Sequence, residues 1–440
     1  MSRQLFGTDG IRGVAGEYPL DSQTVFAFGR ALGEWAGAGA KVLIGMDTRE
    51  SGPDLASLVA AGLGRAGVGY EIAGVLPTPG VAWLTKHGDY KAGLMISASH
   101  NPFGDNGLKV FSHSGYKLPD SEELSLEQRI FALREQAAQR VDVTIPQAGG
   151  AYIDFLESTF PYRLDGWRIV VDGGNGAASF HAPELLTRLG AEVIAIHCAP
   201  NGRNINFDCG ALHTDEMREA VVAHGANLGV SFDGDADRAM FACASGRAID
   251  GDHVLLICGA DLDERGLLPG RAVVATVMSN LGLELALRRR GIELVRTAVG
   301  DKYVLEEMIR RGAVIGGEQS GHVIFHREAT TGDGILTLLR LLEVLVRKGE
   351  SLEELAGELT VLPQKLVNVR FGKKRPIDEL ETGRAAIREC ETEFGAAGRV
   401  LVRFSGTEPL ARVMVEGTEN ARVGYHAQKI AAAIQEELAR

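Results

Sequence analysis

The residues best suited to chemistry are three aspartates that directly follow an apolar run. The segment "NLGVSFDGDADR" places Asp233, Asp235 and Asp237 at alternate positions. Carboxylates this close together repel unless a cation lies among them, and oxygen ligands select Mg²⁺ over softer metals. A calcium loop of the EF-hand type is excluded, because it needs Gly at the place of Arg238 and Glu at the place of Ala244. The pattern predicts a magnesium site, with a solvated acidic turn as the alternative.

A serine follows a second apolar run, in the segment "MISASHNPFGDNGLK". Ser99, flanked by His100 at a strand end, could be a nucleophile or a phosphoryl carrier. The alternative is a serine that caps the turn before Pro102, and a hydrolase triad is not supported because no G-x-S-x-G motif surrounds it. Lys109, ten residues further on, could shuttle a proton if desolvation lowers its pKa. An exposed strand lysine is the alternative there.

A third candidate segment is "LVRFSGTEPLARVMVE". An arginine together with small hydroxyl residues and backbone N–H groups suits a phosphate monoester, because several short charge-assisted bonds can converge on it. An ordinary hairpin turn is the competing interpretation. The residues concerned are Arg403, Ser405, Gly406, Thr407 and Arg412.

The fourth segment is "GGEQSGH", which presents Glu318, Gln319, Ser320 and His322 on a glycine-flanked backbone. Carboxylate and amide groups of this kind match sugar hydroxyls. A polar loop beside a sheet would have the same composition. Each of the four segments is therefore persuasive only together with the others.

The elements that must position these residues alternate along the chain. Short apolar runs such as "KVLIGM", "WRIVVD" and "AVVATV" end in Gly-rich polar loops, and amphipathic stretches with helical spacing lie between them. This alternation predicts α/β domains. Because ligands of open α/β sheets collect beyond the carboxyl ends of the strands, the polar loops are expected to converge.

Length and composition limit the class of protein. A chain of 440 residues is expected to form roughly three domains, and its 45% hydrophobic and 24% charged residues are typical of folded proteins. The Pro/Gly-bearing segment 118–151 and the segment near Pro363 are expected linkers. A net charge of −12 disfavours nucleic acid or an anionic membrane as the main partner. We expect a cytoplasmic protein. The five cysteines are scattered along the chain, so they predict neither a disulfide framework nor a zinc site.

Together the segments resemble the α-D-phosphohexomutase family, whose signatures match "SASHNP", "DGDADR", "GEQSGH" and "SGTEP" in the same order along the chain. The resemblance implies three similar α/β mixed-sheet domains and a smaller α+β C-terminal domain around a central cleft. The expected domains are 1–150 with the phosphoserine, 151–250 with the metal site, 251–364 for the sugar and 365–440 for a phosphate.

The resemblance also implies roles for single residues. Ser99 would carry the phosphoryl group and, with the three aspartates, hold Mg²⁺. Lys109 and His322 would be the acid/base candidates, and Glu318 and Ser320 would bind sugar hydroxyls. The transfer centre would be lined by Arg12, His100 and Arg238, and the non-reacting phosphate would be held by Arg403, Ser405, Gly406, Thr407 and Arg412.

Within the family the chain is most similar to bacterial members that act on glucosamine phosphates, through "LFGTDGIRG", "PNGRNINFDCG" and "VGDKYV". The implied reaction interconverts glucosamine 6-phosphate and glucosamine 1-phosphate, for cell-wall precursor synthesis. Glucosamine 1,6-bisphosphate would be the intermediate, and it or another sugar bisphosphate would prime the enzyme. A small phosphorylated amino sugar is thus the expected partner, with a homodimer as the assembly relatives suggest. A phosphomannomutase or phosphoglucomutase, a Mg²⁺-dependent sugar phosphatase and a silent sugar-phosphate sensor are the alternatives.

Overall fold

The computed structural model describes residues 4–7, 9–146, 150–371, 375–404 and 410–438. The chain forms two compact units, one of residues 1–278 with 295–357 and the other of residues 279–294 with 358–440. The sheets of the first unit mix parallel and antiparallel strands and are accompanied by helices. The α/β multi-domain class predicted from the sequence is confirmed, whereas the central cleft stays a prediction.

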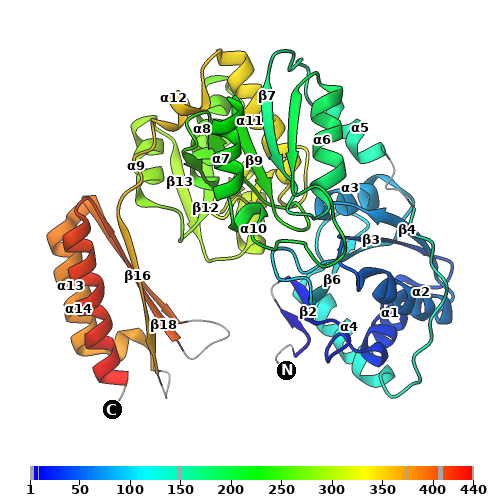
Figure 1. Ribbon diagram of the computed structural model, residues 1–440. Coiled ribbons are helices and arrows are strands. Elements are labelled where there is room, and N and C mark those ends of the chain that lie inside the picture. The colour runs from blue at the N-terminus through cyan, green and yellow to red at the C-terminus, as the bar shows by residue number, and fades with distance from the viewer. Residues whose placement is uncertain (1–3, 8, 147–149, 372–374, 405–409, 439–440) are drawn as a thin grey trace. The chain divides into compact units, whose positions relative to one another are not determined.

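The N-terminal sheet has the strand order β1-β2-β6-β5-β3-β4. Its strands β2, β6, β3 and β4 are labelled in Figure 1. All five residues of β5 are buried, as expected for a strand that is covered on both faces. Since β5 runs antiparallel to β6, the loop between them turns back at the carboxyl end of β5. This loop carries Ser99. The elements are β1 (Phe6–Gly7), β2 (Gly10–Val14), α1 (Ser22–Ala36), β3 (Lys41–Met46), α2 (Gly52–Arg65), β4 (Gly69–Val75), α3 (Thr78–His87), β5 (Ala92–Ile96), β6 (Asp105–Ser112) and α4 (Asp120–Leu133).

The second sheet has the order β11-β10-β9-β7-β8. Its strand β9 is buried at all five positions and pairs antiparallel with β10, from Phe232 opposite Ala239. The connection between these two strands carries the three aspartates. The elements are α5 (Ala151–Ser158), β7 (Arg168–Asp172), α6 (Ala178–Arg188), β8 (Glu192–Ile196), a 3₁₀ turn (Gly210–Leu212), α7 (Asp215–His224), β9 (Leu228–Phe232), β10 (Ala239–Cys243) and β11 (Ala248–Ile249).

The third sheet has the order β13-β12-β14-β15. Its short strands β14 and β15 pair antiparallel, with Gly317 opposite Val323, so residues 318–322 form the loop that joins them. The elements are α8 (Gly251–Glu264), a 3₁₀ turn (Pro269–Arg271), β12 (Ala272–Thr276), β13 (Glu293–Thr297), α10 (Asp301–Arg311), β14 (Ile315–Gly317), β15 (Val323–Phe325), α11 (Gly334–Lys348) and α12 (Leu352–Ala356).

The second unit contains an antiparallel sheet of order β16-β18-β17. Helices α13 and α14 lie side by side against it (Figure 1), and their apolar residues share a core with Val413 and Val415 of the central strand. The elements are α9 (Leu281–Arg289), β16 (Gln364–Arg370), a 3₁₀ turn (Ile377–Glu379), α13 (Glu381–Phe394), a 3₁₀ turn (Gly395–Ala397), β17 (Gly398–Phe404), β18 (Leu410–Gly417) and α14 (Asn420–Leu438).

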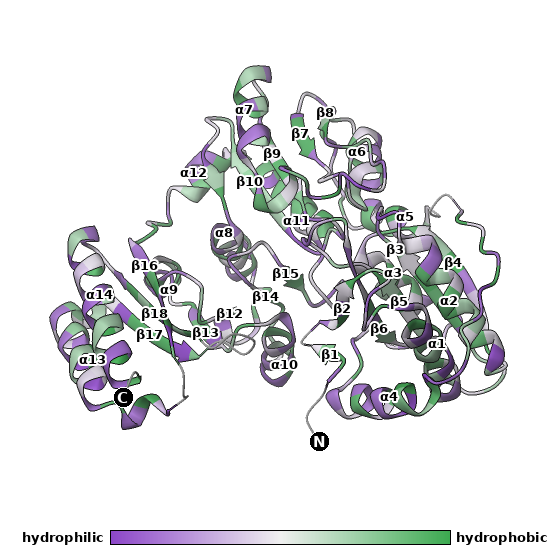
Figure 2. Cartoon of the chain, turned by 60° about the horizontal axis from the view of Figure 1, so that its bottom comes forward, coloured by the Kyte–Doolittle hydropathy of each residue, from purple (hydrophilic) through white to green (hydrophobic). Residues whose placement is uncertain are grey.

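The helices are amphipathic, and Figure 2 shows hydrophilic and hydrophobic residues alternating along α4, α13 and α14. Helix α14, for example, buries Val423, Ile430 and Ile434 on one face. Spacings of three, four and seven residues place apolar side chains on the same side of a helix. Among the described helices, none combines the length and the apolar run that a bilayer crossing requires.

Helix α4 corrects the expected linker of residues 118–151, because residues 120–133 of that segment are helical. The charged residues that suggested a linker take part in packing. Glu122 accepts a hydrogen bond from Trp35 Nε1 at 3.0 Å, and the buried Glu127 accepts the backbone N–H of Leu5 at 2.7 Å. Leu126 and Ile130 of the same helix join the core of the N-terminal domain. The sequence interpretation missed α4 because it relied on the charged residues of the segment and not on the apolar residues that lie between them.

Helices α1 and α2 approach each other closely through glycine. A Cβ atom on Gly62 would lie 2.5 Å from the backbone oxygen of Phe26, and one on Gly29 would lie 2.4 Å from the backbone oxygen of Val59. Real Cβ atoms do not come this near to backbone, so the two helices would have to move apart. Gly64, in the same helix, has open space around it.

We therefore predict that Gly62→Ala destabilises the N-terminal domain while Gly64→Ala does not. Overpacking costs about 1 to 3 kcal/mol, which corresponds to a loss of about 3 to 8 °C in the midpoint of thermal unfolding. Alanine at position 64 gains helix propensity without a clash and should leave the midpoint equal or slightly raised. Equal midpoints for the two variants in differential scanning calorimetry would contradict the close approach.

Candidate active site

Ser99 lies at the end of β5 in an uncommon backbone conformation. Its φ of 54° is in the left-handed region, which few non-glycine residues adopt. The side chain is 2% exposed, and its Oγ donates a hydrogen bond to Oδ2 of Asp233 at 2.6 Å. Gly234 packs so tightly here that a Cβ atom would lie 2.5 Å from the carbonyl oxygen of Ser99. The serine loop and the aspartate loop are thus in direct contact.

The three aspartates after β9 form one buried cluster. Asp233, Asp235 and Asp237 each offer a carboxylate oxygen, and these oxygens lie within 4.8 Å of one another. Burial first, and then the neighbouring carboxylates, raise the pKa of Asp233 and of Asp237. Burial would also raise the pKa of Asp235, but Lys109 lowers it below its ordinary value.

These carboxylates fit a hard divalent cation. Oδ1 of Asp235 and Oδ1 of Asp237 are buried, and neither accepts a hydrogen bond from the described residues. A buried carboxylate oxygen without a donor is costly unless a cation balances it. Because all the donor atoms are oxygens, they suit Mg²⁺ better than a softer metal. The cluster could therefore bind a metal.

Lys109 lies on β6 with its ammonium group among carboxylates. Nζ is 2.8 Å from Oδ2 of Asp235, 2.9 Å from Oδ2 of Asp9 and 4.0 Å from Oδ2 of Asp237. Burial would lower the pKa of Lys109, as the sequence analysis expected, but Asp235 and Asp9 together raise it above the ordinary value. That expectation is wrong because it considered desolvation without the counter-charges. Lys109 is a protonated group, suited to donate a proton or stabilise negative charge.

Asp9 and Lys117 extend this charge network and were not identified from the sequence. Asp9 is shared by Lys109, Lys117 and Arg12, which hold its pKa well below the ordinary value despite burial. Lys117 also donates to Asp301 Oδ2 at 2.5 Å. The segments "GTDGIRG" and "VGDKYV" contained the signal only as matches to the family. Asp9 lies three residues before Arg12, but its contacts with Lys109 and Lys117 join residues about a hundred positions apart.

Arg12 and His100 lie at the serine loop. A guanidinium nitrogen of Arg12 is 3.5 Å from the carbonyl oxygen of Ala98, and the same side chain pairs with Asp9. His100 Nδ1 is 3.4 Å from Oγ of Ser99. Burial, followed by the positive charges of Arg238 and Arg12, lowers the pKa of His100 to about 4. The imidazole is therefore neutral near neutral pH.

Arg238 and His322 also lie close to the aspartates. The backbone N–H of Arg238 donates to Oδ1 of Asp233 at 3.2 Å, and its side-chain Nε is 3.9 Å from Oδ1 of Asp237. His322, in the loop between β14 and β15, places Nε2 3.9 Å from Oδ2 of Asp237 and 3.8 Å from Oδ2 of Asp301. The cluster therefore receives groups from all three sheets of the first unit.

Arg49 is a positioning residue that the sequence analysis missed. Its fully buried guanidinium donates to the carbonyl oxygens of Ser99 at 3.0 Å, Asn101 at 2.8 Å and Asp105 at 2.9 Å, and also contacts that of Pro102. Nothing in the segment "DTRES" distinguished this arginine from a surface residue. It adds side-chain donors to the carbonyl oxygens of the irregular serine loop and so holds that loop in place.

Two further side chains hold the same loop. Asn206 Nδ2 donates to the carbonyl oxygens of Ser99 at 2.9 Å and Asn101 at 3.1 Å. Asp47 accepts from Arg49 Nε at 2.9 Å and from Ser97 Oγ at 2.6 Å, and Ser97 Oγ in turn accepts the backbone N–H of Ser99 at 2.9 Å. The backbone on both sides of the Ser99 hydroxyl is thereby fixed.

A second group with metal-ligand types consists of Asp172, His197 and Cys209. Here the carboxylate is already saturated, because Asp172 accepts the backbone N–H groups of Gly174 at 2.9 Å and Gly210 at 2.8 Å. Its contact with His197 Nδ1 at 3.2 Å raises the pKa of that histidine. This group orders the loop that carries Asn206 and is less suited to a metal than the three aspartates are.

The predicted sugar loop lines a cavity of about 430 Å³. Glu318 accepts the backbone N–H of Gly300 at 3.1 Å on Oε1, and Ser320 Oγ lies 3.4 Å from Oε2. Both side chains are half-buried, so they remain accessible from the cavity.

The predicted phosphate-binding residues belong to the second unit. Arg403 is the next-to-last residue of β17 and lies directly opposite Arg412 of β18. Burial, followed by the charge of Arg412, lowers the pKa of Arg403. Two guanidinium groups at neighbouring positions suit a doubly charged anion. Ser405, Gly406 and Thr407 lie outside the described residues.

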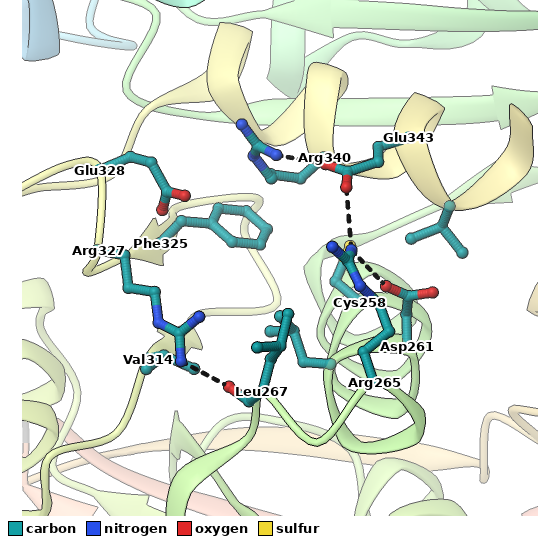
Figure 3. A pocket seen from close by; sticks show the side chains of 12 residues that line it. Cys258, Asp261, Arg265, Leu267, Val314, Phe325, Arg327, Glu328, Arg340 and Glu343 are labelled. Carbon is teal, nitrogen blue, oxygen red and sulfur yellow. Dashed lines mark hydrogen bonds and ion pairs between the residues drawn. The ribbon is translucent and has the colours of Figure 1, made fainter. Parts of the chain in front are cut away.

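A separate pocket of about 150 Å³ lies between α8, α11 and β15 (Figure 3). Arg265 donates to Glu343 at 2.9 Å and to Asp261 at 3.3 Å, and Arg340 pairs with Glu343. The charges of the pocket therefore largely neutralise each other within the fold. None of the predicted site residues lines it.

Comparison with known proteins agrees with this geometry. Four family models match the chain, described as the phosphoglucomutase/phosphomannomutase alpha/beta/alpha domain I (residues 3–137), domain II (150–246), domain III (250–361) and C-terminal domain (366–433). A phosphoglucosamine mutase of Solibacter usitatus is 57% identical, covering 100% of both chains. One of Symbiobacterium thermophilum is 49% identical, covering 99% of both chains.

Among solved structures, a phosphoglucomutase/phosphomannomutase family protein from Burkholderia thailandensis is similar at a TM-score of 0.80 and 25% identity. The similarity covers 98% of this chain and 97% of that one. Full-length relatives, four matched domains and a shared fold thus agree with a buried serine beside three aspartates. The chain belongs to the phosphoglucomutase/phosphomannomutase family, the α-D-phosphohexomutases.

Proposed function

We propose that this protein is an isomerase that interconverts glucosamine 6-phosphate and glucosamine 1-phosphate. The observation that carries the proposal is the 2.6 Å contact of Ser99 Oγ with Asp233, within a buried aspartate cluster that Lys109 faces. Relatives named phosphoglucosamine mutase, 45–57% identical over the whole chain, support the amino sugar as substrate. Their names do not favour a mutase for mannose or glucose phosphates.

We propose that Asp233, Asp235 and Asp237, together with a phosphate on Ser99, hold Mg²⁺. When bound, Mg²⁺ supplies positive charge to the transferring phosphoryl group. The carboxylates are already collected by the fold, so little rearrangement is required for binding. The buried oxygens of Asp235 and Asp237 that accept no hydrogen bond from described residues support this assignment.

In the first half-reaction, the bond between phosphorus and Ser99 Oγ breaks and a bond from phosphorus to the sugar oxygen forms. Lys109, protonated in its ring of carboxylates, gives a proton to the departing serine oxygen. His322 is the candidate to take the proton of the sugar hydroxyl. Arg12, Arg238 and the neutral His100 stabilise the charge on the phosphoryl oxygens.

The product of that step is glucosamine 1,6-bisphosphate, which must turn so that its other phosphate faces Ser99 and returns a phosphoryl group. Glu318 and Ser320 would bind the sugar hydroxyls in both orientations. Arg403, Ser405, Gly406, Thr407 and Arg412 would hold the phosphate that does not react. The same bisphosphate, or another sugar bisphosphate, would prime unphosphorylated enzyme.

The division of labour among the four domains, 1–150, 151–250, 251–364 and 365–440, belongs to this proposal. The first would carry the phosphoserine, the second the metal, the third the sugar loop and the fourth the distal phosphate. The homodimer and the cytoplasmic location stay predictions.

Ser99→Ala is expected to lower kcat for glucosamine 6-phosphate by at least about 10³-fold, because it removes the hydroxyl that carries the phosphoryl group. Incubation with ³²P-labelled glucosamine 1,6-bisphosphate should label the parent enzyme and not the variant. Ser158→Ala, at an exposed position of α5, is the control and should keep both labelling and turnover. An alanine variant as fast as the parent would refute the proposal.

Asp237→Asn is expected to stabilise the protein without metal and to abolish its stabilisation by Mg²⁺. The substitution removes one of three mutually repelling buried charges, which raises the stability of the protein without metal. It also replaces a carboxylate by a neutral amide, which is a weaker ligand for Mg²⁺. The measurement is the midpoint of thermal unfolding with EDTA and with excess MgCl₂. Asp54→Asn, an exposed carboxylate in α2, should retain the difference that the parent shows. A Mg²⁺-induced shift preserved in Asp237→Asn would contradict the assigned ligand set.

A further inference from the structure

The cavity beside the predicted sugar loop is rich in negative charge. It has a volume of about 430 Å³, and its described lining contains two carboxylates but no lysine or arginine. Glu318 interacts with the positive charge of the buried Arg238, which balances it in part. The second carboxylate has no role in the transfer chemistry. The lining residues are Met240, Asp250, Thr276, Met278, Val299, Glu318, Gln319 and Ser320.

The fold fixes Asp250 against the sugar loop. It is the N-cap residue of α8, and the next residue, Gly251, donates its backbone N–H to the carbonyl oxygen of Gln319 at 3.0 Å. A Cβ atom on Gly251 would lie 2.0 Å from the carbonyl oxygen of Glu318. Only glycine allows this approach, and it brings the start of α8 onto the loop that carries Glu318 and Ser320.

The carboxylate of Asp250 is ionised and held in one orientation. Gln319 Nε2 donates to Oδ2 at 3.1 Å, while His253 Nδ1 lies 2.6 Å from Oδ1. Burial would raise the pKa of Asp250, but the hydrogen bond from His253 lowers it. Arg247 lies behind that histidine, 3.5 Å from its Nε2. The Asp250 side chain is 20% exposed, so its charge can meet a ligand in the cavity.

We propose that Asp250, oriented by Gln319, binds the ammonium group of the amino sugar and so determines the preference for glucosamine phosphates. The inference rests on the proposed function and names the contact that distinguishes its substrate. Glu318 and Ser320 bind ring hydroxyls in the same cavity, so the neighbouring amino group of the ring lies near Asp250 in one of the two orientations of the bisphosphate. Gln319 has no role in the transfer chemistry, and on this inference its role is to orient Asp250.

Asp250 should bind an ammonium group more strongly than a hydroxyl or an N-acetyl group at the same ring position. A hydrogen bond between an ammonium group and a carboxylate is charge-assisted and stronger than one from a neutral hydroxyl. Glucose phosphate, which carries a hydroxyl at that carbon, offers Asp250 no positive charge. An N-acetylated sugar presents a neutral amide instead of a cation.

Asp250→Asn tests this inference, because asparagine is an equally good N-cap residue and removes the negative charge, at the cost of one acceptor oxygen. The expected result is a fall of about 10-fold in kcat/KM for glucosamine 6-phosphate and a change of less than about 3-fold for glucose 6-phosphate. Gln319→Ala, which removes the residue that orients Asp250, should shift the same ratio in the same direction by a smaller factor. Thermal unfolding of each variant reports whether the fold is kept.

The matched control is Asp263→Asn, at the other end of α8, where the carboxylate pairs with Arg271 near the surface. It should leave the substrate ratio of the parent unchanged. An equal loss for both sugars in Asp250→Asn would assign a merely structural role to this residue and overturn the inference, while the proposed function would stand. A parent enzyme that isomerises neither sugar phosphate would instead overturn the proposed function and the inference with it.

Discussion

Mutual repulsion among three buried carboxylates is the constraint on which the arrangement of the first unit depends. Asp233, Asp235 and Asp237 are each at most 6% exposed, so water cannot screen them. Lys109 of β6 supplies compensation from the N-terminal sheet, and Arg238 supplies it from the aspartate loop itself, just before β10. Oδ1 of Asp235 and Oδ1 of Asp237 accept no hydrogen bond from the described residues, so a cation could bind there. The charge repulsion that destabilises the protein without metal would then favour metal binding. The same three carboxylates therefore affect both the stability of the fold and its ability to bind a metal.

The second requirement is a reactive hydroxyl whose backbone is held in an unfavourable conformation. Ser99 has a φ of 54°, and such strain persists only where the surroundings over-determine it. Arg49 and Asn206, from two different domains, both donate to its carbonyl oxygen. Because Gly234 touches that same oxygen, the serine loop cannot relax without displacing the aspartates. The position of the Ser99 hydroxyl is therefore coupled to the positions of the aspartate carboxylates.

What the sequence could predict was local in character. Ser99 and the aspartates follow buried strands and carry their chemistry within a few residues, so composition and spacing singled them out as candidates, and the family resemblance joined them into one site. Arg49 and the pKa of Lys109 were not predictable in this way, since their properties come from partners far along the chain. Lys109 meets Asp235 across 126 residues, and Arg49 meets Pro102 across 53. Helix α4 was missed because its charged face is more conspicuous than its apolar one.

The substrate itself explains why transfer and selectivity use separate charges. An amino sugar phosphate is an anion at one end and a cation on the ring, so a site built from arginines alone would bind any sugar phosphate. Around the serine, Arg12 and Arg238 suit the anionic end, whereas Asp250 and Glu318 in the neighbouring cavity suit a cation. Asp250 is tied to Gln319 and His253 and not to the aspartate cluster. On this inference, selectivity can change through Asp250 at the start of α8 while the charge balance around Ser99 is kept.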